Sequence, residues 1–345
     1  MKMVRLGKTG LQVSYMGFGG IPIQRTTPQE TKELFVSLLA QGVNYVDTAR
    51  AYTVSEEWIG RAIEGMRDRF VLATKSKNTT APGMAADIEI SLKNLRTGYI
   101  DLYQVHNPSE KDLDTITAPG GALEALLQAK EGGKIGHIGL TAHSLKVFER
   151  ALELPWVETI MFPYNLVETQ GEALIHRCRE KDIGFIAMKP LAGGALGAAP
   201  GGSGEMDDSA LALRFIAQNP DVTMVIPGVY CAGEVEKNAA ALQDPRPLRE
   251  EEQQRIEAVR DRLGNHFCRR CNYCAPCTKG ISIPNVFLFE GYLTRYGLEQ
   301  WARERYASLS VKAGACIQCG ACEPRCPYQL PIRQMMRAAA EKFGE

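Results

Sequence analysis

One stretch decides the fold of the last quarter of this chain: Cys316-Ile317-Gln318-Cys319-Gly320-Ala321-Cys322-Glu323-Pro324-Arg325-Cys326-Pro327. Its spacing, C-x2-C-x2-C-x3-C-P, is the one with which three thiolates surround a 4Fe–4S cluster while the fourth ligates a neighbouring cluster. A second block lies upstream, at Cys268-Arg269-Arg270-Cys271-Asn272-Tyr273-Cys274-Ala275-Pro276-Cys277. Eight of the ten cysteines lie in these two blocks.

The two blocks predict two 4Fe–4S clusters with crossed ligands. One cluster would be held by Cys268, Cys271, Cys274 and Cys326, and the other by Cys316, Cys319, Cys322 and Cys277. The first block departs from the usual pattern, because only two residues precede its fourth cysteine and Thr278 follows in place of proline. Structural zinc is an alternative, although zinc sites use separate C-x2-C pairs rather than triplets followed by Cys-Pro. A disulfide scaffold is a further alternative, which the absence of a secretory signal disfavours.

The bulk composition limits the class of partner. Forty lysines and arginines balance forty aspartates and glutamates in 345 residues, which gives no reason to expect nucleic acid or an acidic membrane as a partner. The chain lacks an apolar run of about 18 residues, and its start, Met1–Arg5, lacks the apolar core of a signal peptide. We therefore expect a cytoplasmic protein, where many reduced thiols suit iron–sulfur ligation.

Ahead of the cysteines, short apolar runs alternate with amphipathic helical stretches. The runs are nearly continuous, as in parallel strands buried on both faces. They are Val13–Phe18, Val43–Asp47, Phe70–Thr74, Ile100–Val105, Ile135–Leu140, Val157–Phe162, Ile183–Met188 and Val222–Ile226. The helical stretches include Thr31–Gln41, Glu56–Glu64, Ala85–Leu95, Gly121–Glu131, Gln170–Lys181 and Asp208–Asn219. Eight such units predict an α/β fold, the (β/α)8 TIM barrel. A doubly wound open sheet is the alternative, but Gly17-Phe18-Gly19-Gly20 does not match its G-x-G-x-x-G turn.

We expect three parts along the chain: a barrel over 1–244, a connecting helix over 245–264, and a small, mainly helical, ferredoxin-like iron–sulfur domain over 265–345. Within the last part, Val286–Tyr296 is helix-like and rich in aromatic residues, which would shield the clusters or seal an interdomain seam. The segment Ala192–Asp208 contains six glycines and is either a lid over the barrel or a disordered surface loop.

Four polar residues lie at or just after the ends of the second, third and fourth expected strands: Asp47, Tyr52, Lys75 and His106. In a TIM barrel these positions meet at one mouth. A phenol is a weak acid with a pKa of about 10, a nearby ammonium lowers that pKa, and a buried carboxylate holds the ammonium in place. A neutral imidazole can orient a carbonyl oxygen. The four residues therefore suit proton delivery to a carbonyl that is reduced by hydride from a nicotinamide.

The same residues carry a resemblance to the aldo-keto reductase family. It rests on Gly42-Val43-Asn44-Tyr45-Val46-Asp47-Thr48-Ala49-Arg50-Ala51-Tyr52, on Thr74-Lys75, on Asp101-Leu102-Tyr103-Gln104-Val105-His106-Asn107-Pro108 and on the opening Leu6–Leu11 with Met16–Gly19. The whole chain is similar to a branch in which a ferredoxin-like domain follows the barrel. The resemblance implies that Tyr52 is the acid, that Lys75 and Asp47 tune it, and that His106 orients the substrate.

The resemblance also implies a site for NAD(H) or NADP(H), whose residues here are Thr141, Met161, Met188, Pro190, Leu191, Pro227, Gly228, Glu234 and Asn238. Several depart from the family pattern. Ala142 replaces an asparagine, Met161 replaces a glutamine, and Met188 replaces the aromatic residue that stacks on the nicotinamide. Glu234 stands where an arginine would hold the 2′-phosphate, which favours NADH over NADPH.

Three functions remain open from these residues. The first is a nicotinamide-dependent enzyme that reduces an aldehyde or ketone, or oxidises the alcohol. In the second, the clusters feed electrons with little nicotinamide dependence, a scheme that normally needs a flavin, for which the chain has no signature. In the third, the clusters are structural and the tail docks a redox partner protein. The substrate is a small carbonyl or alcohol, and the polar loops favour a sugar-like one.

Overall fold

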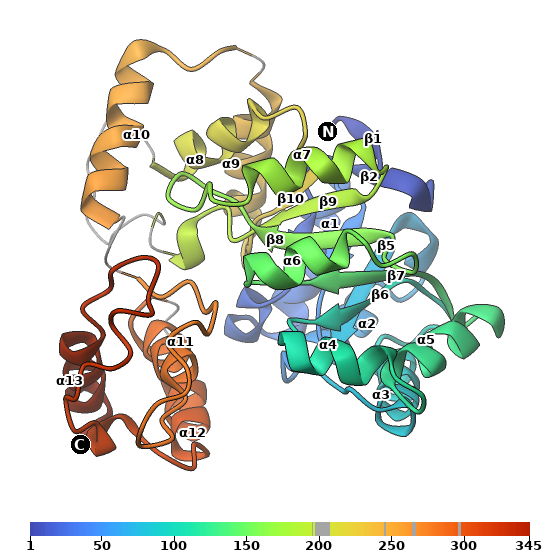
Figure 1. Ribbon diagram of the computed structural model, residues 1–345. Helices are drawn as coiled ribbons and strands as arrows, with labels where there is room; N and C mark the ends of the chain where they lie inside the picture. Colours follow the sequence, from blue (N-terminus) through green and yellow to red (C-terminus); the bar gives the residue numbers. More distant parts are fainter. Residues whose placement is uncertain (195, 197–207, 245, 264–266, 296–297) are drawn as a thin grey trace. The chain divides into compact units, whose positions relative to one another are not determined.

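Figure 1 shows the computed structural model, which describes residues 1–194, 196, 208–244, 246–263, 267–295 and 298–345. Contacts divide the chain into two compact units. The first comprises Met1–Leu191 with Gly197–Leu248, and the second comprises Ala192–Leu196 with Arg249–Glu345. The expected lid falls largely on 195 and 197–207, outside the described residues.

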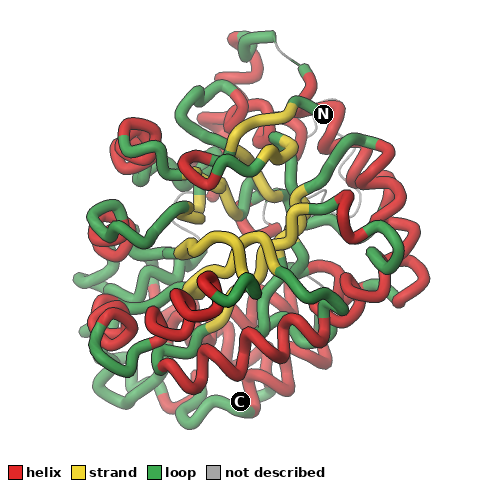
Figure 2. The backbone as a smooth tube through the Cα atoms, turned by 90° about the vertical axis from the view of Figure 1, so that its right-hand side faces the viewer, coloured by secondary structure: helices red, strands yellow, loops and turns green. Residues whose placement is uncertain are grey.

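The first unit is built on one sheet of eight parallel strands in chain order. They are β3 (Phe18–Gly19), β4 (Tyr45–Asp47), β5 (Val71–Ser76), β6 (Ile100–His106), β7 (Ile135–Thr141), β8 (Thr159–Pro163), β9 (Gly184–Met188) and β10 (Met224–Ile226). Parallel bridges from Met16 to Val225 and from Gly19 to Gly228 join the first and last strands. The strands gather centrally with helices outside them (Figure 2), which confirms the TIM-barrel prediction.

Nine described α-helices belong to this unit: α1 (Pro28–Ala40), α2 (Ser55–Ala62), α3 (Ala81–Asn94), α4 (Glu110–Thr117), α5 (Ala122–Glu131), α6 (Leu145–Ala151), α7 (Glu172–Glu180), α8 (Asp208–Ala217) and α9 (Ala232–Gln243). Local signals start several of them. Thr27 and Glu30 form a capping box at α1, and Ser109 and Asp112 form one at α4. The sequence stretches named above missed α4, α6 and α9.

The first expected strand, Val13–Phe18, was wrong as a single element. Its first half belongs to an antiparallel hairpin of β1 (Met3–Arg5) and β2 (Gln12–Ser14), and only Phe18–Gly19 joins the barrel. The hairpin places buried Leu6 against the start of β9, where an added Cβ on Gly184 would lie 2.7 Å from Leu6 Cδ1. The hairpin therefore covers the end of the barrel at which the strands begin, and the opposite end is left for the site.

Two apolar layers hold the barrel together. The larger lies between strands and helices, and a smaller one fills the interior with Tyr45, Ala73, Leu102, Met161, Ile186, Met224 and Ile226, closed by Leu6 and Val13 of the hairpin. The interior is thus a packed core rather than a pore, which confines chemistry to the mouth.

The second unit contains α10 (Glu250–Leu263), α11 (Ile283–Thr294), α12 (Glu299–Ala307) and α13 (Ile332–Phe343), with both cysteine blocks in loops. Aromatic rings join its helices: Tyr292 lies 4.2 Å from Trp301, and Tyr306 stacks on Phe343 at 3.7 Å between ring centroids. Across both units, the described helices include none that is long and apolar enough to cross a membrane.

Candidate active site and cysteine pocket

The centre of the barrel mouth is a buried ion pair. Asp47 ends β4 and Lys75 lies near the end of β5, and their side chains are 4% and 2% exposed. The Lys75 ammonium donates to the Asp47 carboxylate and to the carbonyl oxygen of Thr48, the latter at 2.8 Å. Because the lysine has two acceptors in a dry environment, its position is fixed.

A third buried residue, Gln104, holds the carboxylate of this pair. Gln104, wholly buried on β6, donates from Nε2 to Asp47 Oδ1 at 3.1 Å. Gln104 was not among the residues predicted for the site, although its position gave a signal. It lies two residues before His106 on one strand, so both side chains face the same side of the sheet.

Tyr52 and His106 lie beside the pair. The Tyr52 ring centroid is 5.1 Å from Lys75 Nζ, and the ring meets His106 edge-on with centroids 5.9 Å apart. Tyr52 sits in the loop between β4 and α2, where its N–H donates to the Ala49 carbonyl oxygen at 3.0 Å. The structure thus brings together all four residues that the sequence singled out.

Burial opposes charge on both members of the pair. It raises the pKa of Asp47 above its usual value, and hydrogen bonds from Lys75 and Gln104 oppose that rise. Burial lowers the pKa of Lys75, and the Asp47 carboxylate opposes that fall. Each residue therefore depends on the other to remain ionised.

A buried carboxylate supports the loop that carries Tyr52. Glu56, 1% exposed on α2, accepts hydrogen bonds from Arg50 at 2.6 Å and Thr74 at 2.8 Å, and from Ser91 at 2.7 Å and Asn94 at 3.2 Å. These contacts tie the loop to β5 and α3. This network could not be predicted from the sequence, because exposed and buried glutamates look alike on an amphipathic helix.

The end of β7 carries the first residue expected to meet a nicotinamide. Thr141 is 1% exposed, and its hydroxyl oxygen accepts the N–H of Asn107 at 2.9 Å. The Asn107 side-chain oxygen lies 2.8 Å from His143 Nδ1. These bonds join the ends of β6 and β7, and they leave the Thr141 hydroxyl proton available as a donor.

The ends of β8 and β9 are apolar where the family usually has polar or aromatic contacts. Met161 is 2% exposed and belongs to the interior cluster, against which Met188 packs. Pro190 is buried and Leu191 is partly buried just beyond. The amide of Asn165 points elsewhere, since it donates to Glu168 and to the Lys189 carbonyl oxygen, each at 2.9 Å.

The loop from β10 into α9 is open to solvent. Pro227 and Asn238 are buried, whereas Gly228 is exposed. A Cβ added at position 228 would lie 2.8 Å from Pro22, so a larger residue would crowd that ring. An added Cβ on Gly233, in the first turn of α9, would have nothing within 4 Å. This accessible helix start fits the phosphates of a dinucleotide.

Glu234 is engaged with its own loop. Its carboxylate accepts the Tyr230 N–H at 3.0 Å, and the guanidinium of Arg25 lies 4.0 Å from the centroid of the Tyr230 ring. Burial raises the pKa of Glu234, while the Tyr230 bond, Arg25 and Lys237 oppose the rise. Arg25, at the end of the short 3-10 helix Pro22–Arg25 after β3, therefore brings a positive charge close to this carboxylate.

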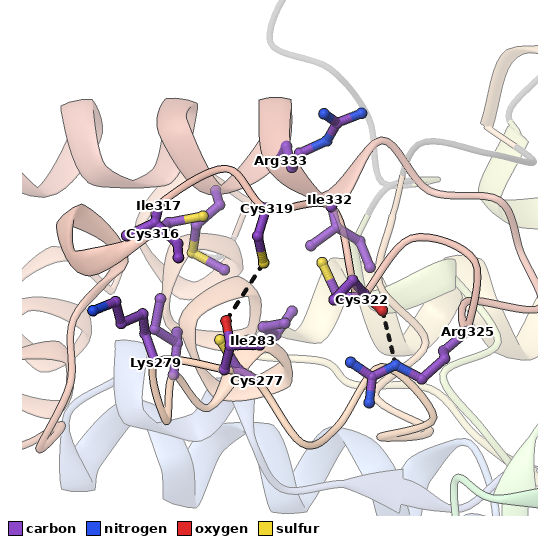
Figure 3. Close-up of a pocket in the computed structure, with 15 residues that line it drawn as sticks. Cys277, Lys279, Ile283, Cys316, Ile317, Cys319, Cys322, Arg325, Ile332 and Arg333 are labelled. Atoms are coloured by element: carbon purple, nitrogen blue, oxygen red, sulfur yellow. Dashed lines mark hydrogen bonds between the residues drawn. The ribbon is translucent and has the colours of Figure 1, made fainter.

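The second unit gathers thiols around a pocket, shown in Figure 3. Its lining includes Cys277, Cys316, Cys319 and Cys322, the four thiols that the spacing assigns to one cluster. Among the described residues, no three His, Cys, Asp or Glu side chains meet closely enough to share one metal ion. The thiols instead surround a space, which fits a cluster whose irons each take one thiolate.

The other four cysteines are also near one another. Burial raises the pKa of Cys271, and the nearby Cys326 adds to the rise. Burial likewise raises the pKa of Cys274 to about 12, with Cys268 and Cys271 adding to it. The proximity of Cys326 to the first block is what crossed ligation requires.

Comparison with known proteins supplies the family. The model of the Aldo/keto reductase family matches residues 15–209, more than half of the chain. This chain belongs to the aldo-keto reductase family. A second family, described as a 4Fe-4S dicluster domain, matches residues 267–331. The aldo-keto reductase barrel is therefore followed by an iron–sulfur domain, as the resemblance implied.

Relatives of this aldo-keto reductase include YhdN of Bacillus subtilis, 33% identical over 50% of this chain and 56% of YhdN, so the match spans little more than half of that relative. L-galactose dehydrogenase of Arabidopsis thaliana is 25% identical over 75% of this chain and 94% of its own length. Among solved structures, the holo form of AKR11C1 from Bacillus halodurans is 27% identical with a TM-score of 0.65, over 75% of this chain and 96% of that one. An aldo-keto reductase of Klebsiella pneumoniae in complex with NADPH is 25% identical with a TM-score of 0.63, over 75% and 94%.

Proposed function

We propose that this protein is a nicotinamide-dependent reductase of small aldehydes or ketones, with Tyr52 as the proton donor. The observation that carries the proposal is the arrangement of Tyr52, Lys75, Asp47 and His106 at the barrel mouth. Lys75 lies 5.1 Å from the Tyr52 ring centroid and is held by two acceptors. Membership of the aldo-keto reductase family supports the reaction type.

Each residue has a defined task in carbonyl reduction. A bound nicotinamide supplies hydride to the carbonyl carbon. Tyr52 gives its phenolic proton to the oxygen, so that hydride and proton together convert carbonyl to alcohol. The Lys75 ammonium stabilises the phenolate left on Tyr52, and Asp47 with Gln104 keeps that ammonium charged and fixed. His106, edge-on to Tyr52, orients the carbonyl oxygen between them.

The nucleotide would lie across the ends of β7 to β10. Thr141 offers a buried hydroxyl to the carboxamide, and the apolar surface of Met161, Met188, Pro190 and Leu191 would lie beneath the ring. The start of α9 would take the phosphates, with Pro227, Gly228 and Asn238 shaping the approach and Glu234 near the ribose. We propose that NADH binds at least as well as NADPH, because Glu234 disfavours a dianionic phosphate.

For the substrate we propose a hydroxylated, sugar-like carbonyl. The polar loops of the mouth motivate this class, and the similarity to L-galactose dehydrogenase over 94% of that protein supports it. For the second unit we propose two 4Fe–4S clusters with the crossed ligand sets given above. The match to a dicluster domain and the ring of Cys277, Cys316, Cys319 and Cys322 support them.

A second candidate function keeps the barrel chemistry but gives the nicotinamide a minor part. Met161 and Met188 offer a carboxamide only weak thioether acceptors and no donor, which favours a weakened nicotinamide site. In that case the iron–sulfur domain would supply electrons, with a flavin or a substrate that tolerates one-electron steps as intermediary.

An anaerobic titration with NADH, NADPH and dithionite, after iron and sulfide analysis, tests both candidates. The reductase proposal expects about eight irons and eight sulfides per chain for two 4Fe–4S clusters, micromolar binding of a nucleotide, and its oxidation by aldoses or hydroxyaldehydes. Binding of neither nucleotide below millimolar concentration would overturn it and favour the second candidate. Two zincs and no iron would overturn the cluster assignment.

A further inference from the structure

The thiol pocket in Figure 3 lies at the surface of the second unit. Cys319 is exposed, and Cys277, Cys316 and Cys322 are partly exposed. In the other set Cys268, Cys271 and Cys326 are also partly exposed, but no thiol is as open as Cys319, and Cys274 is only 7% exposed. Ile317, between two of the ligands, is 57% exposed, the highest value among the large hydrophobic side chains described. One cluster site is therefore accessible to another molecule, and an apolar side chain stands beside it.

Cationic side chains surround the four thiols. The pocket is lined by Lys279, Arg325 and Arg333, and none of its described lining residues is acidic. The nearest acid on the same loop is Glu323, which pairs with Arg333 at 2.9 Å. The Arg325 guanidinium is fixed beside the thiols by bonds to the carbonyl oxygens of Ala321 at 2.9 Å and Pro276 at 3.0 Å. The bias is local, since the whole chain carries a formal net charge of zero.

We propose that this face, made of Lys279, Ile317, Cys319, Arg325 and Arg333, docks an acidic one-electron carrier protein. An apolar centre within a charged rim is the usual anatomy of a transient interface. Cations around the rim attract an acidic partner and orient it before contact. Ile317 then excludes water beside Cys319, the exposed thiol of the pocket. The transfer itself moves one electron from the carrier to the iron–sulfur domain, with no bond made or broken.

Docking at this face is independent of carbonyl reduction, because it is followed by the iron–sulfur absorption of the full chain. Reduced flavodoxin, an acidic one-electron carrier, is mixed anaerobically with the protein, and bleaching is followed by stopped flow. We expect a second-order rate that falls as salt is added. Lys279→Glu should lower that rate about fivefold or more at low salt, and Ile317→Ser should lower it with less dependence on salt.

Two controls separate docking from other causes. Lys32→Glu, at an exposed position of α1 in the first unit, makes the same charge change elsewhere and should leave the rate unchanged. Iron content must be equal in all variants, and if Lys279→Glu loses iron, Ile317→Ser decides the test. The methyl viologen radical, a small cationic reductant, should reduce Lys279→Glu at least as fast as the unaltered protein.

Three outcomes would overturn the proposal: a flavodoxin rate independent of salt, equal losses in Lys279→Glu and Lys32→Glu, or reduction by methyl viologen with none by flavodoxin. Each leaves the proposed reductase function standing, since that function is judged by nucleotide binding and carbonyl turnover.

Discussion

The two sides of the barrel mouth are built differently. At the ends of β4 to β6, Asp47, Lys75 and Gln104 are buried and bonded to one another. In β8 and at the end of β9 stand two methionines, of which Met161 is buried in the interior cluster and Met188 is partly buried against it. The first side holds a charge in one place, which proton transfer requires. The second side offers apolar contacts, which do not fix the orientation of a bound group. We therefore expect a nucleotide to gain its affinity mainly at the start of α9.

This difference has an energetic basis. Removing a charged lysine and a carboxylate from water costs several kcal/mol, which only close pairing and further hydrogen bonds offset. Such an arrangement tolerates little change. Apolar contacts tolerate more, because methionine adapts its shape and substitutions of similar volume cost little. The acid–base side is thus the more sharply determined half of the site, and the variants below test that contrast.

The largest effect is expected from Tyr52→Phe, on the acid–base side. The variant removes the donated proton and leaves the ring, so kcat for carbonyl reduction should fall by roughly two to four orders of magnitude. The dissociation constant of the nucleotide should stay the same, which assigns the loss to chemistry. Tyr99→Phe, at a side chain 39% exposed, is the matched control and should have no effect. Near-normal turnover in Tyr52→Phe would remove the assignment.

Lys75→Met should harm both activity and stability. It strands the Asp47 charge in a dry site, for which we expect a loss of about 3 to 5 kcal/mol in the free energy of unfolding. Adding Asp47→Asn should restore much of the stability without restoring turnover, since the phenol still lacks its cation. Urea unfolding followed by tryptophan fluorescence measures the first quantity and steady-state kinetics the second. Recovery of activity in the double variant would contradict the role given to Lys75.

Substitutions on the nucleotide side of the mouth should have smaller effects. Glu234→Arg should shift the ratio of the NADPH and NADH dissociation constants about tenfold toward NADPH at low salt, because a repulsive charge becomes attractive. Arg25→Met should shift it the other way, since Arg25 lies 4.0 Å from the Tyr230 ring centroid and near Glu234. Equilibrium binding followed by nucleotide fluorescence provides the measurement. A tenfold NADPH preference in the unaltered protein would show that Arg25 or Lys237 already dominates the site.

The smallest effect is expected at the opposite end of the strands, where a substitution should change the free energy of unfolding but not the activity. Burial alone would raise the pKa of Glu158, but bonds from His137, Lys130 and the Ile138 N–H hold it at about 2. A carboxyl with a depressed folded pKa stabilises the protein fully above its unfolded pKa of about 4.5, and that contribution is lost as the pH falls through about 2.

Glu158→Gln should therefore lower the unfolding free energy by about 1 to 2 kcal/mol at neutral pH, and by progressively less below about pH 4.5. Circular dichroism of urea unfolding at several pH values measures this, while kcat should not change. A loss that is the same at every pH would contradict the assignment to the Glu158 charge.

Much of this molecule could be predicted from local pattern. Continuous apolar runs predicted the strands because parallel strands are buried on both faces. The spacing of the second block predicted its iron–sulfur domain because cluster ligation needs thiols a fixed number of residues apart. The positions of Asp47, Tyr52, Lys75 and His106 after successive strands were enough to place them at one mouth, because parallel strands end at the same edge.

Tertiary structure alone decided the partners that are distant in sequence. Gln104 bonds Asp47, which is 57 positions away in the sequence. Arg25, before the second barrel strand, packs on Tyr230, which follows the last one. The predicted strand Val13–Phe18 divides between a hairpin and a barrel strand. Spacing along a chain reports which residues share one strand or one loop. Which side chains meet depends on barrel closure and on burial, and these arise only when every strand has found its neighbours.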